Sequence, residues 1–167
     1  MIHIRTATPQ DAAAIYEITR KAFTLYADEL KKGSHVKALE EPLGTTQRDI
    51  AEHSVLVAEE DGVVLGSLRL KSLTPDLVYL FRFGVDPSIR NVGVGSTLLQ
   101  AAIDECRNKG FAAIALHTNA KYYKLARYYY GKKFFVHSTA TDKGYIRALF
   151  VKELSGKPYD ISPAFRE

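Results

Sequence analysis

Hydrophobic positions along the chain form two kinds of pattern, one typical of helices and one typical of strands. Ile15, Ile18 and Ala22 recur at the three- and four-residue spacing of an amphipathic helix that opens after Pro9. Other runs are rich in β-branched and aromatic residues, as strands are. The pattern predicts strands over residues 2–5, 54–59, 63–70, 77–85, 111–118, 134–139 and 145–154. It predicts helices over 9–23, 96–109 and 121–130, with further helical segments between residues 25 and 53.

Turn signals separate these elements and suggest how they connect. Asp61-Gly62 is a hairpin signal, and Gly110 suits the C-cap of the helix before it. The element order predicts an α+β (mixed α/β) fold, with a central, twisted, mainly antiparallel sheet flanked by helices. No repeat or linker divides the chain. We therefore expect one domain over residues 1–154, followed by an extended tail over 155–167.

Composition narrows the class of protein. Of the 167 residues 46% are hydrophobic and 25% charged, which is typical of a globular domain. No run approaches the roughly 18 apolar residues of a membrane helix, and no secretory signal opens the chain. The single cysteine, Cys106, excludes an intramolecular disulfide, and no Cys/His spacing suits a metal. We expect a cytoplasmic protein with no metal and no membrane partner.

The charge balance argues against nucleic acid as a partner. The 23 basic and 19 acidic residues leave a net charge of +4, and the excess is scattered along the chain. Clusters such as Lys132-Lys133 are typical of a solvated surface. We therefore expect no nucleic-acid partner.

The most informative stretch covers residues 85–99. A strand ends, the chain turns through Gly93 and Gly95, and a helix begins. The first N–H groups of a helix have no partner within it, and the helix dipole adds positive charge there. Glycines leave those amides open to a bulky anion. Arg90 adds a charge, and Asn91 tolerates an unusual backbone angle. This pattern predicts a phosphate or pyrophosphate site.

Two other phosphate-binding motifs do not fit. A Walker A loop needs Gly-Lys-Ser/Thr, whereas the Gly-Lys pairs of this chain are followed by Lys133 and Pro158. A dinucleotide-binding turn needs a third small residue, where this chain has Leu98. An isolated Gly-x-Gly would merely connect a strand to a helix, but the preceding Arg90 makes this one more specific.

Residues 90–95, Arg-Asn-Val-Gly-Val-Gly, resemble the Arg/Gln-x-x-Gly-x-Gly/Ala signature of the GNAT N-acetyltransferase superfamily. The element order resembles that family over residues 4–154. The resemblance implies a GNAT-like acyl-CoA N-acyltransferase fold with acetyl-CoA as co-substrate. It implies that backbone amides of residues 92–97 bind the coenzyme A pyrophosphate, while the strand ending at Val85 pairs with the pantetheine arm. The residues implied to contact the cofactor are Val85, Arg90, Asn91, Val92, Gly93, Val94, Gly95, Ser96, Thr97 and Asn119.

The tyrosine-rich segment 121–135 carries a second part of the resemblance. Ala126, Tyr129 and Phe134 match the family pattern Ala-x-x-Tyr-x-x-x-Gly-Phe, although Lys133 replaces its glycine. The resemblance implies that the Tyr129 hydroxyl protonates the departing coenzyme A thiolate. Tyr130 takes this role if the register differs by one residue. A packing role is the alternative, since tyrosines at helical spacing commonly belong to a core.

Asn119 is the candidate to replace an asparagine that many family members have before the tyrosine. The asparagine that family members often have seven positions before the tyrosine is Tyr122 here. Asn119 lies close enough in the chain to supply the corresponding hydrogen bond to the pantetheine arm.

The group that accepts the proton of the amine is unassigned. Many family members carry a glutamate on the strand 77–85, where this chain has Arg82. His117 is the nearest titrating group by type, with a half-buried packing role as the alternative. Further candidates lie in the variable acceptor region: Glu29, His35 and His53.

These observations predict an N-acetyltransferase in which a small-molecule or peptide amine attacks acetyl-CoA directly in a ternary complex. Cys106 lies among buried helix positions, which argues against a cysteinyl acyl-enzyme. Two alternatives remain: transfer of a longer acyl group, and a non-catalytic coenzyme A-binding sensor or interaction module. Homodimerisation through the last strands or the tail also stays open.

Overall fold

The computed structural model has seven strands and four α-helices among its described residues, which are 1–30, 36–89 and 93–167. The strands are β1 (His3–Thr6), β2 (Ser54–Glu60), β3 (Val63–Ser72), β4 (Leu77–Val85), β5 (Ala113–Asn119), β6 (Phe135–Ala140) and β7 (Arg147–Glu153). The helices are α1 (Ala12–Leu30), α2 (Leu43–Glu52), α3 (Val94–Asn108) and α4 (Tyr123–Gly131). Three 3-10 helices complete the set: η1 (Pro9–Asp11), η2 (Lys37–Glu40) and η3 (Ser162–Arg166).

Hydrogen bonding orders the strands β1-β2-β3-β4-β5-β7-β6. The β4–β5 pair is parallel and joins Leu77–Tyr79 to Ala113–Ala115. The pairs β1–β2, β2–β3, β5–β7 and β6–β7 are antiparallel. The predicted mixed α/β class with a mainly antiparallel sheet is therefore confirmed.

The chain forms two compact units. Unit 1 comprises Met1–Leu70 and Arg82–Ala102, and unit 2 comprises Lys71–Phe81 and Ile103–Glu167. Strands β3 and β4 and helix α3 contribute residues to both. The expectation of a single domain over residues 1–154 stays a prediction.

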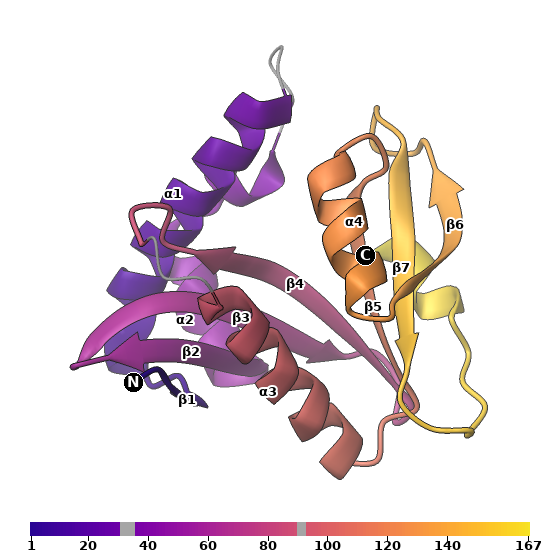
Figure 1. The fold of residues 1–167 in the computed structure, drawn as a ribbon, viewed down its shortest axis with the longest axis horizontal. Coiled ribbons are helices and arrows are strands. Elements are labelled where there is room, and N and C mark those ends of the chain that lie inside the picture. The colour runs from indigo at the N-terminus through magenta and orange to yellow at the C-terminus, as the bar shows by residue number, and fades with distance from the viewer. Residues whose placement is uncertain (31–35, 90–92) are drawn as a thin grey trace. The chain divides into compact units, whose positions relative to one another are not determined.

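Unit 1 has helices on both faces of its strands (Figure 1), with α1 and α2 on one side and the start of α3 on the other. Ile15 of α1 is fully buried with Val55 and Val57 of β2. Alternation along β4 explains the two layers. The Cβ position of Gly84 faces Ala22 of α1, whereas Phe83 and Val85 face the start of α3.

An ion pair holds the entry to α1. The Arg5 guanidinium donates to both carboxylate oxygens of Asp11, at 2.7 and 2.9 Å. The Thr8 backbone N–H also donates to Asp11, at 2.7 Å. These contacts lower the pKa of Asp11 from 3.8 to about 2, with the Arg5 hydrogen bonds as the largest cause.

Asp11→Asn should lower the free energy of unfolding by about 2 kcal/mol at pH 7. Because the folded pKa lies below the unfolded one, this stabilisation is present above pH 3.8 and lost as the pH falls toward 2. Urea unfolding at pH 7 and pH 3 checks it, and about half of the difference should remain at pH 3. Asp61→Asn, in an exposed turn, is the control and should change neither value. A pH-independent deficit at Asp11 would contradict the ion-pair explanation.

Unit 2 packs two different layers against its strands. Phe150 of β7 faces α4, where its ring centroid lies 5.7 Å from that of Tyr129. The alternate residues Leu149 and Val151 share a buried cluster with Ala164 of η3. The two sides of β7 therefore bury separate sets of side chains, in keeping with strand alternation.

We expected an extended tail over residues 155–167, but only part of this segment lacks regular structure. Residues 155–161 contain neither helix nor strand, but Ser162–Arg166 forms η3. Ala164 has no exposed surface, and Arg147 donates to the Phe165 carbonyl at 3.1 Å. Burial of a small apolar side chain and a guanidinium–carbonyl hydrogen bond hold this segment on unit 2.

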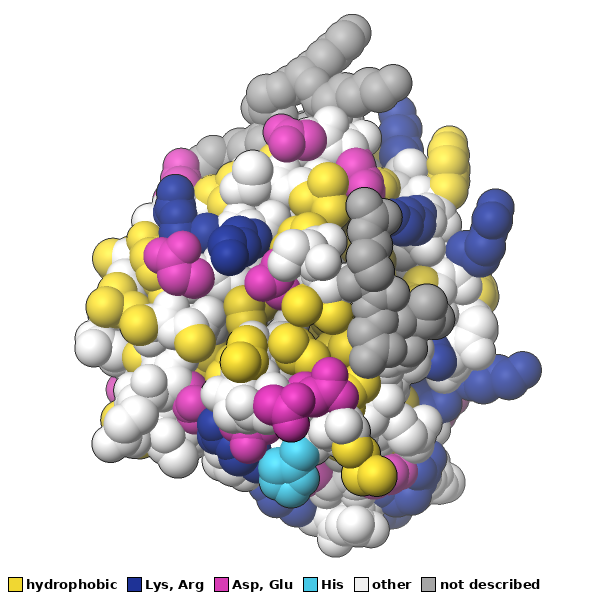
Figure 2. Space-filling model, turned by 60° about the vertical axis from the view of Figure 1, so that its left-hand side comes forward, with side chains coloured by type: hydrophobic (Ala, Val, Ile, Leu, Met, Phe, Trp, Pro, Cys, Tyr) yellow, Lys and Arg dark blue, Asp and Glu magenta, His cyan; other side chains and the backbone are white. Residues whose placement is uncertain are grey.

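Charged side chains of both signs lie interspersed, between hydrophobic ones, on the face shown in Figure 2. None of the described helices combines the length and the hydrophobicity needed to cross a membrane. Within the described part of the chain, no group of three or more His, Cys, Asp or Glu side chains is placed to hold a metal. The expectations about metal and partners stay predictions.

Candidate functional site

The end of β4 and the start of α3 lie together in unit 1. A Cβ added at Gly95 would lie 3.5 Å from Val85 Cγ2 and 3.6 Å from Phe83 Cζ. Gly93 has φ +111°, a conformation that L-residues rarely adopt, with open space around its Cβ position. The predicted turn between a strand and a helix is thus present, and glycine is required at position 93 for its backbone angle.

The first helical turn shows which amides an anion could meet. The Thr97 N–H donates to the Gly93 carbonyl at 2.8 Å, so this amide is already used within the turn. Val94 and Gly95 precede it, at the positive end of the helix dipole, and Ser96 lies in the same turn. The remaining residues expected here, Arg90, Asn91 and Val92, lie outside the described residues.

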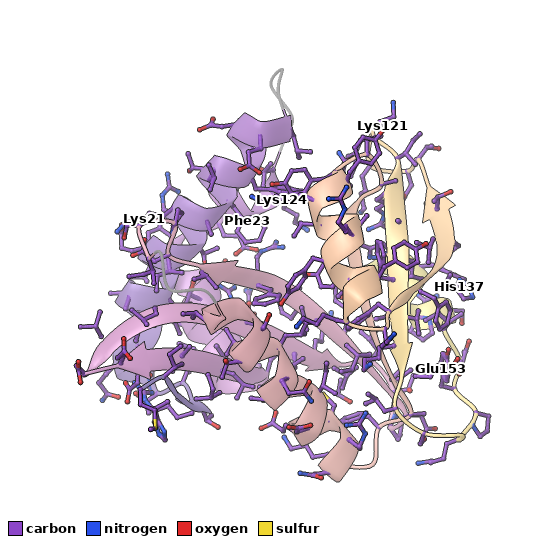
Figure 3. All side chains as sticks on the ribbon, viewed as in Figure 1. Lys21, Phe23, Lys121, Lys124, His137 and Glu153 are labelled. Carbon is purple, nitrogen blue, oxygen red and sulfur yellow. The ribbon has the colours of Figure 1, made fainter. Side chains whose placement is uncertain are left out.

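Two further glycines bring β4 close to its neighbours. A Cβ at Gly84 would lie only 2.9 Å from Ala22 Cβ of α1, beside Phe23 (labelled in Figure 3). A Cβ at Gly66 of β3 would lie 3.1 Å from the Gly84 carbonyl oxygen. Side chains at either place would push β4 away. The sequence analysis missed this requirement, although a glycine inside an apolar strand is a signal for close backbone approach.

Asn119 ends β5 in unit 2. Its side-chain oxygen accepts a hydrogen bond from the Lys121 backbone N–H at 2.9 Å, and its carbonyl accepts one from Tyr122 at 3.0 Å. The residue therefore shapes the turn into α4. A contact with a cofactor stays a prediction for Asn119.

Tyr129 and Tyr130 differ sharply in environment. Tyr129 is 5% exposed, and its ring lies 5.5 Å from that of Phe134, whereas Tyr130 is 55% exposed. Lys133, which stands at the family's glycine position, adopts a left-handed φ of +68°. The turn thus keeps a backbone conformation that glycine adopts more readily.

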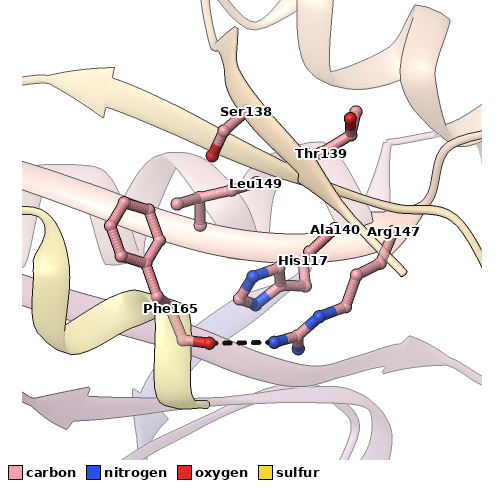
Figure 4. Close-up of a pocket in the computed structure, with 7 residues that line it drawn as sticks. All are labelled: His117, Ser138, Thr139, Ala140, Arg147, Leu149 and Phe165. Carbon is pink, nitrogen blue, oxygen red and sulfur yellow. Dashed lines mark hydrogen bonds between the residues drawn. The ribbon is translucent and has the colours of Figure 1, made fainter. Parts of the chain in front are cut away.

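His117 lines a cavity of about 310 Å³ in unit 2 (Figure 4). Strands β5, β6 and β7 and helix η3 supply its lining residues, which are His117, Ser138, Thr139, Ala140, Arg147, Leu149 and Phe165. His117 Nδ1 lies 2.7 Å from the Tyr79 hydroxyl. Burial, and secondarily the Arg147 charge, lower the pKa of His117 from 6.5 to about 4. The imidazole is therefore neutral at pH 7 and able to accept a hydrogen bond.

An NMR titration of His117 should show an imidazole that stays neutral down to about pH 5 and titrates near 4. Since this folded pKa lies below the unfolded value, the unfolded chain binds the proton first and stability falls as the pH drops from 6.5 to 4. The loss should be about 2 kcal/mol, allowing for partial exposure. His117→Gln should flatten this dependence, and His137→Gln, at an exposed position, should not. A pKa near 6.5 would refute the assigned environment.

The two candidate proton-transfer residues lie on opposite faces of the unit 2 strands. His117 alternates with Leu116 and Thr118 along β5 and shares the η3 face with Leu149. Tyr129 packs from α4 on Phe150, on the other face. The paired strands β5 and β7 therefore separate the two side chains.

A charged cluster in unit 1 includes Arg82, which stands on the strand where many family members carry a glutamate. Arg82 of β4 adopts φ +51°, and its Nε and Nη2 donate to Glu41 Oε1 at 2.9 and 2.5 Å. Arg69 of β3 is 1% exposed and donates to Asp49 at 2.7 Å and to Thr46 at 3.2 Å. The sequence analysis missed this cluster, and an arginine within the apolar strand β3 was the available signal.

The structure gives less support to the other candidate proton acceptors, Glu29, His35 and His53. His53 Nε2 lies 4.0 Å from Asp49 Oδ1, Glu29 belongs to α1, and His35 lies outside the described residues. Cys106 is buried, and that burial raises the pKa of its thiol to about 12. A thiol held neutral in this way is a poor nucleophile, which supports the expectation against a cysteinyl intermediate.

The comparisons with known proteins agree with this geometry. The sequence model described as "Acetyltransferase (GNAT) family" matches residues 12–134. A comparison with curated protein sequences gave no match.

Solved structures of similar fold cover nearly the whole chain. The PaiA N-acetyltransferase of Thermoplasma acidophilum, in complex with coenzyme A, aligns with a TM-score of 0.80 and 20% identity over 92% of this chain and 99% of that one. The ribosomal-protein-S18-alanine N-acetyltransferase of Escherichia coli aligns with a TM-score of 0.75 and 18% identity, over 96% of this chain and 98% of that one. YncA of Salmonella typhimurium, with acetyl-CoA, aligns with a TM-score of 0.70 and 21% identity, over 95% of this chain and 96% of that one. At these identities the likeness establishes the fold.

Proposed function

Because the chain belongs to the GNAT acetyltransferase family, whose members are acyl-CoA N-acyltransferases, we propose that it transfers the acetyl group of acetyl-CoA to an amine. The acceptor is a small molecule or a peptide, and its nitrogen attacks the thioester directly in a ternary complex. One observation carries the proposal: a glycine-lined helix start lies against the end of β4 in unit 1.

The residues at this helix start fit the diphosphate of coenzyme A. Gly93 has open space where a side chain would stand, and Gly95 lets the start of α3 lie close to Val85 and Phe83. Amides and dipole at a helix start favour a bound anion. The backbone of β4 beyond Tyr79, where its ladder with β5 ends, is proposed to pair with the pantetheine arm.

The reaction requires two proton transfers besides the exchange of bonds. The amine nitrogen forms a bond to the thioester carbon, and the carbon–sulfur bond breaks. The nitrogen loses a proton to a base, and the leaving sulfur gains one from an acid. We assign the acid to the Tyr129 hydroxyl, which must reach the thioester sulfur when the cofactor is bound.

His117 is the proposed proton acceptor, directly or through water. Its imidazole is neutral at pH 7 and can accept a proton, although a pKa near 4 makes it a weak base.

Calorimetric titration of the purified protein with acetyl-CoA tests the proposal, with coenzyme A, ATP and NAD as further titrants. We expect acetyl-CoA and coenzyme A to bind and NAD to bind far more weakly. Release of coenzyme A in the presence of a panel of amines then tests transfer. A folded protein that does not bind acetyl-CoA would overturn the proposal. Binding without turnover of any amine would favour the sensor alternative.

A further inference from the structure

We propose that Glu41 is a positioning residue for the cofactor, which holds Arg82 in its left-handed conformation and thereby sets the path of β4 from Phe83 to Val85. This inference rests on the proposed function, since it concerns the strand assigned to the pantetheine arm. Glu41 follows η2, at the entrance to α2, and reaches β4 across 41 positions of sequence.

The first observation is a strained backbone under a strong restraint. Arg82 has φ +51°, which is uncommon for a residue with a side chain and unusual within a strand. Its guanidinium donates twice to a single carboxylate oxygen of Glu41. The two side chains are only 19% and 15% exposed, so water screens the pair weakly. Such a pair can maintain a backbone conformation that the chain would otherwise leave.

The second observation is that Glu41 is itself held in place. Its other carboxylate oxygen lies 3.5 Å from Arg69 Nη1. Arg69 is almost completely buried and is anchored by Asp49 and Thr46 of α2. The two arginines, Arg69 and Arg82, and the two carboxylates, Glu41 and Asp49, therefore balance in charge. Because each partner is fixed by another element, the Glu41 carboxylate is a rigid reference point for Arg82.

The third observation connects Arg82 to the site. The residues that follow it, Phe83 and Val85, face the Gly95 position at the start of α3, within 3.6 Å. Rotation of the Arg82 backbone toward ordinary strand angles would turn the succeeding peptides. The backbone groups assigned to the pantetheine arm would then point elsewhere, and the contact with Gly95 would change.

A double-mutant cycle separates positioning from mere stabilisation. Glu41→Gln, Arg82→Gly and the double variant are each titrated with acetyl-CoA, and thermal unfolding establishes that they are folded. Glu41→Gln should weaken binding about tenfold, in keeping with the cost of left-handed backbone at a non-glycine residue. Arg82→Gly should weaken it about threefold, because glycine adopts this angle without restraint but is less preorganised. Adding Glu41→Gln to Arg82→Gly should change the dissociation constant no further.

Glu59→Gln is the matched control. Glu59 also accepts a hydrogen bond from an arginine of unit 1, Arg5, at 2.9 Å, and the pair lies on β1 and β2, which β3 separates from β4 in the sheet. Its binding of acetyl-CoA should equal that of the wild type. Unchanged binding by Glu41→Gln, or an equal effect of Glu41→Gln in both backgrounds, would leave Glu41 a structural residue and overturn the inference alone. Failure of the wild-type protein to bind acetyl-CoA would overturn the proposed function as well.

Discussion

Replacing Gly95 by aspartate should weaken the binding of acetyl-CoA by about 100-fold, or nearly 3 kcal/mol. The new carboxylate would stand at the start of α3, where the proposed site receives the diphosphate. It would repel the anion and compete for the amides of the first helical turn. Calorimetric titration measures the loss, and it should lessen as salt screens the repulsion.

The fold gives this experiment a close control. A side chain at position 95 meets Val85 and Phe83, so a carboxylate there costs stability, and thermal unfolding establishes that the Gly95→Asp variant is folded at the temperature of the titration. Gly95→Ala adds only a Cβ, in ordinary contact with Val85 and Phe83 at 3.5 and 3.6 Å, and should bind acetyl-CoA within a few-fold of the wild type. Equal affinity of the aspartate variant and the wild type would place the diphosphate elsewhere.

Tyr129→Phe should lower kcat by about 100- to 1,000-fold while the dissociation constant for acetyl-CoA stays unchanged. The variant lacks the hydroxyl assigned to protonate the leaving thiolate but keeps the ring, whose contacts with Phe134 and Phe150 are apolar. Release of coenzyme A, measured with an amine that the wild type acetylates, gives kcat. The defect should shrink with an acyl donor whose leaving thiol is more acidic, because such a thiol depends less on an acid.

Tyr130→Phe provides the comparison within the same helix. Tyr130 is exposed and adjacent in sequence, so its loss should leave kcat within about twofold of the wild type. If instead Tyr130→Phe abolishes turnover and Tyr129→Phe does not, the family register is displaced by one residue and Tyr129 is a packing residue. If both variants keep their activity, neither tyrosine is the acid.

Much of the fold follows from local pattern. The run of apolar and aromatic residues predicted a strand over 77–85, and β4 spans Leu77–Val85. The predicted helix over 96–109 begins two residues earlier, at Val94, because the Gly93 carbonyl already accepts the Thr97 amide. Residues 25–53 were poorly predicted, since their pattern is broken. The structure continues α1 to Leu30 and places α2 at Leu43–Glu52.

The glycine turn illustrates a site that local sequence can specify. A strand end, two glycines and a helix start are consecutive in the chain, so their meeting needs no distant contact. The structure adds that Gly93 has φ +111° and that Gly95 lies against the β4 side chains. Which of Tyr129 and Tyr130 is buried was undecided by local pattern, because consecutive tyrosines occupy residues 128–130 of this helix. Both rings lie 5.7 Å from that of Phe150, but only Tyr129 also packs on Phe134 and is buried.

The sequence by itself thus determined the element order, the mixed sheet and the glycine turn between a strand and a helix, because these depend on periodicity and on neighbours in the chain. Only the tertiary structure decided which distant side chains meet. It paired Glu41 with Arg82, buried Arg69 beside Asp49, and put His117 and Tyr129 on opposite faces. These meetings depend on strand register and on how the helices pack, and a shift of one residue along a strand would reverse every face.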